Sequence, residues 1–178
     1  MVDSSPGRLL REGTINRQHD VVDENAGDYA GGLDDLQAGR LRLIGDDPVA
    51  RYREDPVRMI RAVRFACKLG FVIDPACEAP IPNLAPLLHE LPPARLFEEM
   101  LKLFHSGYAL DAFEKLRHYG LFAELFPETE EMLAREEHDF PITFVSRGLD
   151  NTDQRIREDK PVTPAFLFAV LLWEPVRR

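Results

Sequence analysis

One basic, otherwise apolar segment, residues 51–68, constrains the fold of this chain more than any other. On a helix of 3.6 residues per turn, its cations after Pro56 fall within an arc of about 120°. These cations are Arg58, Arg61, Arg64 and Lys68. The other positions are all apolar: Val57, Met59, Ile60, Ala62, Val63, Phe65, Ala66 and Cys67. A surface helix is polar over about half its circumference, so this pattern predicts a helix that is buried on most sides and shows one narrow cationic stripe.

The boundaries of this helix are marked by its flanking residues. Asp55 followed by Pro56 is typical of a helix start, with a capping carboxylate before proline at the first helical position. Gly70 is the kind of residue that ends a helix in the left-handed conformation. The segment therefore predicts a helix from residue 56 to 69.

Most of the remaining chain also has helical periodicity. The strand signal is confined to residues 39–45, which alternate polar and apolar and have no obvious partner strand nearby. We therefore predict an all-α, multi-helix fold with at most a short strand near residues 41–44. Residues 1–32 are predicted to be irregular and residues 33–178 to form the helical domain. The further helices are expected at 92–106, 109–118, 129–137, 143–157 and 165–173.

The charge of the chain is unevenly distributed. Net charge is -9, yet residues 51–68 hold six cations and two carboxylates and so carry +4. An anion such as a nucleotide would be attracted to that segment. The alternative is that these cations form an ordinary solvent-exposed face of a helix without a ligand.

The cysteines and the apolar segments indicate the cellular compartment to expect. The two cysteines, Cys67 and Cys77, form no zinc-type spacing, so no structural metal is expected. Residues 1–13 lack the apolar core of a signal peptide, and the longest apolar run, residues 166–173, is too short to span a bilayer. A reduced, cytoplasmic protein is expected.

The carboxylates at the start of the basic helix suggest a binding site. Glu54 and Asp55 lie about one turn before Arg58. A carboxylate beside an arginine presents an acceptor and a planar donor fork, which is what reading the edge of a purine base requires. The structural alternative is that Asp55 caps the helix and neutralises Arg58 within the core. The residues alone leave both readings open.

The same residues spell a family motif. Glu54, Asp55 and Arg58 form the Glu-Asp-x-x-Arg pattern, and the chain resembles the class II nucleotidyltransferases, the group of bacterial poly(A) polymerases and CCA-adding enzymes. The runs Arg-Glu-Asp-Pro-Val-Arg-Met and Glu-Asp-Lys-Pro-Val-Thr-Pro-Ala favour the poly(A) polymerase branch. The resemblance extends in order over 28–36, 43–45, 51–69, 92–104, 116–122 and 155–168.

This resemblance implies a function and a set of site residues. The family transfers AMP from ATP to an RNA 3′ end, using Mg²⁺, and releases pyrophosphate. Partners would be ATP and the RNA 3′ end. By resemblance, Asp55 and Arg58, with Glu54 in the same motif, would face the adenine base. Arg61 and Arg64 would support the base or the phosphates.

The family's catalytic carboxylates are not found in this sequence. The resemblance implies an Asp-x-Asp pair on a separate palm domain that holds two magnesium ions, because two-metal catalysis needs carboxylates close together. Asp34-Asp35 and Asp46-Asp47 are adjacent pairs that would diverge, so neither fits. We therefore expect the neck and body of the family without metal ligands, and a chain that is inactive alone. The alternatives are a non-catalytic helical module that binds nucleotide, RNA or protein, and an inactive truncated gene product. The apolar run at 166–173 is expected to be an uncovered helix through which the chain self-associates.

Overall fold

The computed structural model describes residues 32–135 and 140–177 and contains helices with one two-stranded sheet. The all-α prediction is therefore confirmed. Residues 1–31 lie outside the described part, so the division of the chain near residue 33 stays a prediction. The elements are α2 Gly32–Gln37, β1 Arg40–Leu41, α3 Pro48–Glu54, α4 Val57–Leu69, β2 Val72–Ile73, α5 Pro75–Glu78, α6 Ile81–Leu84, the 3₁₀-helix η1 Ala85–Glu90, α7 Pro93–Phe104, α8 Ala109–His118, α9 Leu121–Leu125, α10 Pro127–Ala134, α11 Phe140–Arg157 and α12 Pro164–Arg177.

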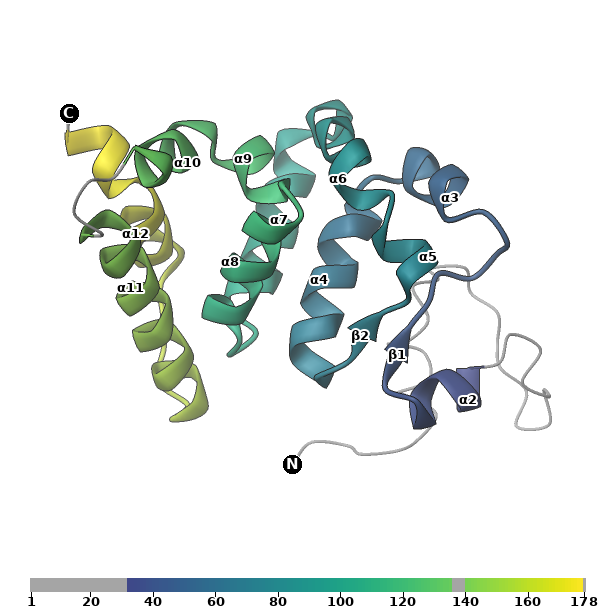
Figure 1. Ribbon diagram of the computed structural model, residues 1–178. Coiled ribbons are helices and arrows are strands. Elements are labelled where there is room, and N and C mark those ends of the chain that lie inside the picture. Colours follow the sequence, from purple (N-terminus) through teal and green to yellow (C-terminus); the bar gives the residue numbers. More distant parts are fainter. Residues whose placement is uncertain (1–31, 136–139, 178) are drawn as a thin grey trace.

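The helices form a row from the strand end of the molecule to its C-terminal end (Figure 1). At the strand end α4 packs against α7 and α8. Further along the row α8 contacts α11, and α12 packs on both α11 and α10. The core runs through all of these contacts, and its fully buried side chains include Tyr52, Ile60, Leu103, Phe113 and Leu121.

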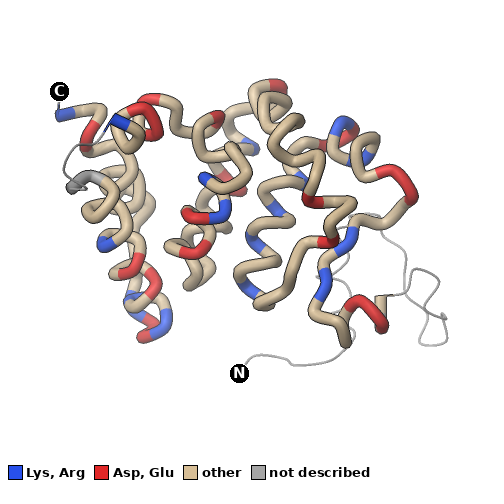
Figure 2. Tube along the Cα trace, in the orientation of Figure 1, with Lys and Arg blue, Asp and Glu red and all other residues tan. Residues whose placement is uncertain are grey.

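Helix α4 has the burial that its sequence predicts. All eight apolar positions from Val57 to Cys67 are buried, the three arginines of the helix are partly buried, and Lys68 is exposed. Figure 2 shows the basic positions spaced along α4 without acidic residues between them. The helix ends at Gly70, whose φ of 65° is left-handed, as predicted.

The strand lies at residues 40–41 rather than 41–44, and it pairs with a second strand that the sequence did not reveal. Strand β1 covers Arg40–Leu41 and pairs in parallel with β2, Val72–Ile73. The Val72 amide donates to the Gly39 carbonyl at 2.9 Å, and the Asp74 amide to the Leu41 carbonyl at 2.8 Å. A parallel pair needs a crossover connection, and here α3 and α4 lie between the strands.

Every long helix that periodicity predicts is present, and the short ones were missed. The predicted helices at 92–106, 109–118, 129–137, 143–157 and 165–173 correspond to α7, α8, α10, α11 and α12. The missed elements are α2, α3, α5, α6, η1 and α9, and each has seven residues or fewer. Two turns or less cannot show a reliable 3.6-residue period.

Helix α12 corrects the expectation of an uncovered apolar helix. Leu167, Val170 and Leu171 are buried, because α12 packs on α11 and α10. The Thr129 hydroxyl of α10 donates to the Leu171 carbonyl at 2.9 Å. Only Phe166, Trp173 and Val176 are large, exposed apolar side chains on this helix. No helix in the described part of the chain is long and apolar enough to cross a membrane.

Two side-chain features join α11 to its neighbours. Buried Asp153 accepts the Ala109 and Leu110 amides at 2.6 and 3.0 Å, so a residue of α11 caps the start of α8. At the contact between α11 and α12, Gly148 of α11 lets α12 approach closely because it has no side chain. A Cβ atom added at Gly148 would lie 2.5 Å from a methyl carbon of Val170.

We predict that Gly148→Ala destabilises the protein although alanine favours helices. The gain in helix propensity is about 1 kcal/mol. Overpacking against Val170 costs about 1–3 kcal/mol, so the free energy of unfolding in urea should fall. Exposed Asn151 on the same helix provides the control, since Asn151→Ala should be neutral or stabilising.

A double-mutant cycle separates the clash from other effects. Gly148→Ala should cost less in a Val170→Ala background, because the obstructing methyl groups are gone. If Gly148→Ala has the same effect in both backgrounds, or if it stabilises the protein, then a clash with Val170 does not determine its effect on stability.

Candidate nucleotide-binding site

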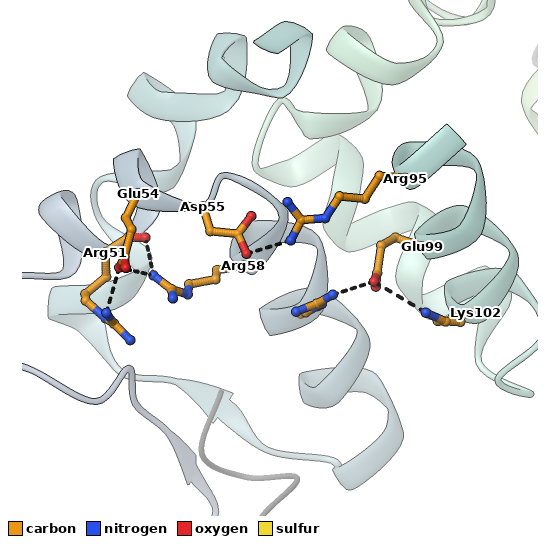
Figure 3. Close-up of polar contacts among 8 residues, drawn as sticks. Arg51, Glu54, Asp55, Arg58, Arg95, Glu99 and Lys102 are labelled. Atoms are coloured by element: carbon orange, nitrogen blue, oxygen red, sulfur yellow. Dashed lines mark hydrogen bonds and ion pairs between the residues drawn. The ribbon is translucent and has the colours of Figure 1, made fainter. Parts of the chain in front are cut away.

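The predicted site residues lie where α3 ends and α4 begins. Asp47 caps α3 by accepting the Ala50 amide at 3.1 Å, and α3 ends at Glu54. The next residue, Asp55, has an extended backbone, with φ of -150° and ψ of 92°. This break sends the two neighbouring carboxylates to different partners (Figure 3).

Glu54 is the carboxylate that pairs with Arg58. Its Oε2 atom accepts from Arg58 at 2.7 Å and from Arg51 at 2.6 Å. The same Arg58 nitrogen, Nη1, also donates to the Arg51 carbonyl at 2.7 Å. The hydrogen bond from Arg58 and its charge lower the pKa of the Glu54 carboxyl below its ordinary value. The guanidinium of Arg58 is thereby held at one nitrogen.

Asp55 neither caps α4 nor neutralises Arg58, so the structural alternative for this residue is wrong. The residue before α4 is Pro56, and no side chain caps the helix there. The Asp55 carboxylate instead accepts through Oδ2 from Nη2 of Arg95 on α7, at 2.8 Å. A charged donor competes better for a carboxylate than a backbone amide does.

The second oxygen of Asp55 is unsatisfied. Oδ1 is buried and has no hydrogen-bond partner among the described residues. A buried acceptor without a donor costs about 1–3 kcal/mol, so Oδ1 is an acceptor that the described side chains leave unsatisfied. Asp55 thus has one engaged oxygen and one that a donor could satisfy.

Arg61 is engaged by a second acidic residue of α7. Its Nη2 donates to Oε1 of Glu99 at 2.6 Å, and Lys102 lies 3.6 Å from the same oxygen. The Glu99 side chain is 3% exposed and that of Arg61 12%. Burial alone would raise the pKa of the Glu99 carboxyl, but the hydrogen bond and charge of Arg61 outweigh it and hold the pKa below its ordinary value.

Arg64 lies one turn further along α4. Its guanidinium carbon is 4.4 Å from the centroid of the Phe65 ring, which is within cation–π range. The structure therefore keeps Arg58, Arg61 and Arg64 on one side of α4, and it gives each a different set of contacts.

The sequence reading missed the residues that α7 contributes. Arg95 and Glu99 are 40 and 38 positions from their partners, too far for local pattern to connect them. Their spacing of four residues on a predicted helix was the one available signal, since it puts both on a common face.

The described residues give no cluster suited to a metal ion. No group of three or more His, Cys, Asp or Glu side chains within 32–135 and 140–177 could hold one. Of the adjacent acidic pairs, Asp35 binds Arg42 at 2.9 Å and Asp47 caps α3. These acidic residues are engaged by the protein itself and do not fit the magnesium of the resembled family.

Removing the charge of Glu99 should destabilise the protein. Glu99→Gln keeps the shape but leaves Arg61 without its anion, and breaking a buried pair costs about 3 kcal/mol. Glu98→Gln, on the exposed neighbour, should change the free energy of unfolding by less than about 0.5 kcal/mol. Urea unfolding of both variants measures the difference.

The effect of Glu99→Gln should depend on pH in a definite direction. Because the folded-state pKa lies below the ordinary value of 4.5, the stabilisation is complete above that pH. It is lost as pH falls through the folded-state pKa, so the wild type and Glu99→Gln should converge in acid. A gap that widens toward low pH would contradict this assignment of charge.

Comparison with known proteins shows which families the chain is similar to. A family described as "Probable RNA and SrmB- binding site of polymerase A" matches residues 70–133. Poly(A) polymerase I of Salmonella typhi is 48% identical over 167 residues, covering 93% of this chain and 36% of that protein. Poly(A) polymerase I of Haemophilus influenzae is 45% identical over 189 residues, covering 98% of this chain and 42% of that protein.

A second branch matches less extensively. The CCA-adding enzyme of Bacillus subtilis is 32% identical over 133 residues, covering 73% of this chain and 33% of that enzyme. The chain thus spans between about a third and two fifths of the length of these curated relatives. The higher identity and coverage lie with the polymerases, as the sequence motifs indicated. The chain therefore belongs to the poly(A) polymerase family of class II nucleotidyltransferases.

Proposed function

We propose that this chain is the base-reading part of a poly(A) polymerase, which binds ATP and the RNA 3′ end to which AMP is added. The observation that carries the proposal is the pair of groups at the start of α4. Asp55 keeps one unsatisfied acceptor oxygen, and Arg58 is held through Nη1 by Glu54 and by the Arg51 carbonyl. An oriented acceptor beside an oriented donor complements a base edge that carries an amino group next to a ring nitrogen.

This pattern selects among the four bases. Adenine and cytosine each present an amino donor beside a ring-nitrogen acceptor, whereas guanine and uracil present a carbonyl oxygen beside an N–H donor. An Asp–Arg pair therefore favours adenine and cytosine. Asp55 would accept from the amino group and Arg58 would donate to the ring nitrogen.

The remaining cations of α4 supply charge. We assign Arg61 and Arg64 to support of the base or the phosphates, through the positive potential of the α4 stripe. The direct contacts of Arg61 go to Glu99, so this role is electrostatic and indirect. The matched family description supports RNA binding by residues 70–133, which run from the end of α4 to α10. We propose that residues 33–178 act together in this binding.

A non-catalytic nucleotide- or RNA-binding module is the second candidate. It is favoured by the charged groups at the start of α4, which are paired with one another and could hydrogen-bond a ligand without taking part in a reaction. Both candidates share the base-reading proposal and differ only in whether a reaction follows. The two cysteines are free and buried, which is compatible with the cytoplasmic location that we propose.

Arg58→Met should remove base-dependent ATP binding by the chain. Affinity should be only about millimolar, since one base-edge pair provides about 1–3 kcal/mol against the entropy of association. We expect ATP to shift NMR signals of residues 54–68 in the wild type. Arg58→Met should abolish the difference between ATP and UTP, because the donor fork is lost.

The control for this experiment is Arg53→Met, which removes an exposed cation of α3 near the site. It should leave the difference between ATP and UTP intact, and added salt should weaken only the part common to both nucleotides. Shifts that map elsewhere, or that survive in Arg58→Met, would remove the support for base reading at α4.

Self-association through α12 is a separate proposal, and fewer exposed apolar side chains support it than the sequence suggested. Phe166, Trp173 and Val176 are the exposed apolar side chains of this helix. Light scattering over a concentration series should show association that Trp173→Gln reduces. A monomer at every concentration would mean that these side chains do not mediate contact between copies.

A further inference from the structure

We infer that Phe97 of α7 and Phe168 of α12 form a platform on which one base of single-stranded RNA stacks, apart from the start of α4. The inference rests on the proposed function, because it names a second place where the same RNA strand would be held. The platform uses no residue of the Glu-Asp-x-x-Arg pattern. Phe168 also lies outside residues 70–133, the segment that the RNA-binding family description matches.

The two rings form an open stack. Their centroids lie 5.3 Å apart and their planes differ by 10°, so the rings are close to parallel. Phe168 is partly buried and packs against the core, whereas Phe97 is 47% exposed. Parallel rings are offset from each other, so Phe168 covers only part of one face of Phe97. Phe97 therefore keeps ring surface that another flat group could cover.

The exposure of Phe97 sets it apart from the other large apolar residues of its helix. Met100, Leu103 and Phe104 are all buried. Along α7, which the structure describes throughout, Phe97 is the one large apolar side chain that is exposed. A ring that serves only the core would be covered. Phe97 is held in place by a second ring and is still open to a ligand.

Cations lie on the adjoining face of the same helix. Lys102 is 50% exposed and lies 3.6 Å from Glu99, the carboxylate that Arg61 also binds. Two cations thus share one anion, and this spot keeps a net positive charge. On an α-helix Lys102 lies about 140° around the axis from Phe97, and the helix is about 10–12 Å across. A strand whose phosphate meets Lys102 can therefore place a base on Phe97.

The exposed carboxylate of Glu98 lies between these two side chains on the surface of α7. It would repel a phosphate directly above the helix. The phosphate would consequently be held at the Lys102 side, and the base would reach Phe97 across α7. A neutral base can cross this carboxylate, whereas the charged backbone cannot do so without cost.

Single-stranded RNA fits this surface better than a protein partner does. Exposed aromatic surface beside cations is how proteins bind single strands with little regard to sequence, because every base has a flat π face. A protein interface of standard size would cover about 800 Å² of this chain. Phe97 has no large exposed apolar neighbour on α7, and Phe166 lies about 160° around α12 from Phe168. The exposed surface suits one base.

The test is the affinity of the chain for a single-stranded oligoadenylate of about ten nucleotides, measured by fluorescence anisotropy. Phe97→Leu keeps an apolar side chain and removes the ring. It should weaken binding by at least about fivefold, the effect expected for one stacked base. Stacking involves no ion release, so the salt dependence of the affinity should stay the same. Lys102→Met should instead reduce that salt dependence.

A matched control and a rescue variant accompany this change. Phe166→Leu removes a ring that is 41% exposed on the far side of α12, and it should leave the RNA affinity unchanged. Phe97→Trp keeps a stacking ring and should bind RNA at least as tightly as the wild type. If Phe97→Leu does not fold, the wild type decides. Its Phe97 and Phe168 ring signals should shift in NMR spectra when RNA is added, and unchanged signals would contradict stacking there.

The outcomes separate this inference from the function on which it rests. A wild type that binds no single-stranded RNA overturns RNA binding and this inference together. Equal RNA affinity of the wild type and Phe97→Leu overturns the inference alone. The difference between ATP and UTP binding reports on the start of α4 and should be the same in both proteins. If Phe97→Leu reduces self-association in light scattering and leaves RNA binding unchanged, the rings are a protein contact and the inference is wrong.

Discussion

The burial of α4 on nearly all sides is the constraint on which the rest of the structure depends. A helix with eight buried apolar side chains cannot leave its arginines in the interior without partners, because an unpaired buried charge is strongly unfavourable. The anions come from both sides of α4. Glu54 is supplied by the end of α3, and Glu99 by α7. Charge pairing thus accompanies apolar packing where α7 meets α4.

The rest of the helical row follows from that placement. Helix α8 packs on α4 and on α7, and its start is capped from a distance by Asp153. That cap ties α8 to α11. The absence of a side chain at Gly148 lets α12 pack closely on α11. Each step uses a polar or steric feature that fixes one helix against the next. Apolar burial supplies most of the stabilisation, whereas these features choose the register.

The candidate site is a product of the same constraint. Because α7 must approach α4 to neutralise Arg61, it also brings Arg95 to Asp55. The carboxylate that would face a base is then held by the body of the protein rather than by its own helix. Relatives of this chain include poly(A) polymerases and CCA-adding enzymes, and the start of α4 is where the proposal locates the base in this chain.

The amino-acid sequence alone determined the helical class, the long helices, the burial of α4 and the identity of Glu54, Asp55 and Arg58 as site candidates. These follow from local periodicity and from adjacent residues, which are independent of the rest of the chain. The partners of these residues depended on the tertiary structure. From the sequence, Asp55 could face a base or could cap the helix and neutralise Arg58, and its ion partner Arg95 was not indicated. The strand at residue 40 pairs with a strand that lies two helices further along the chain. The ion partner of each charged side chain and the covered face of α12 depend on contacts between residues some 40 positions apart in sequence. A local sequence pattern carries no information about contacts over such separations.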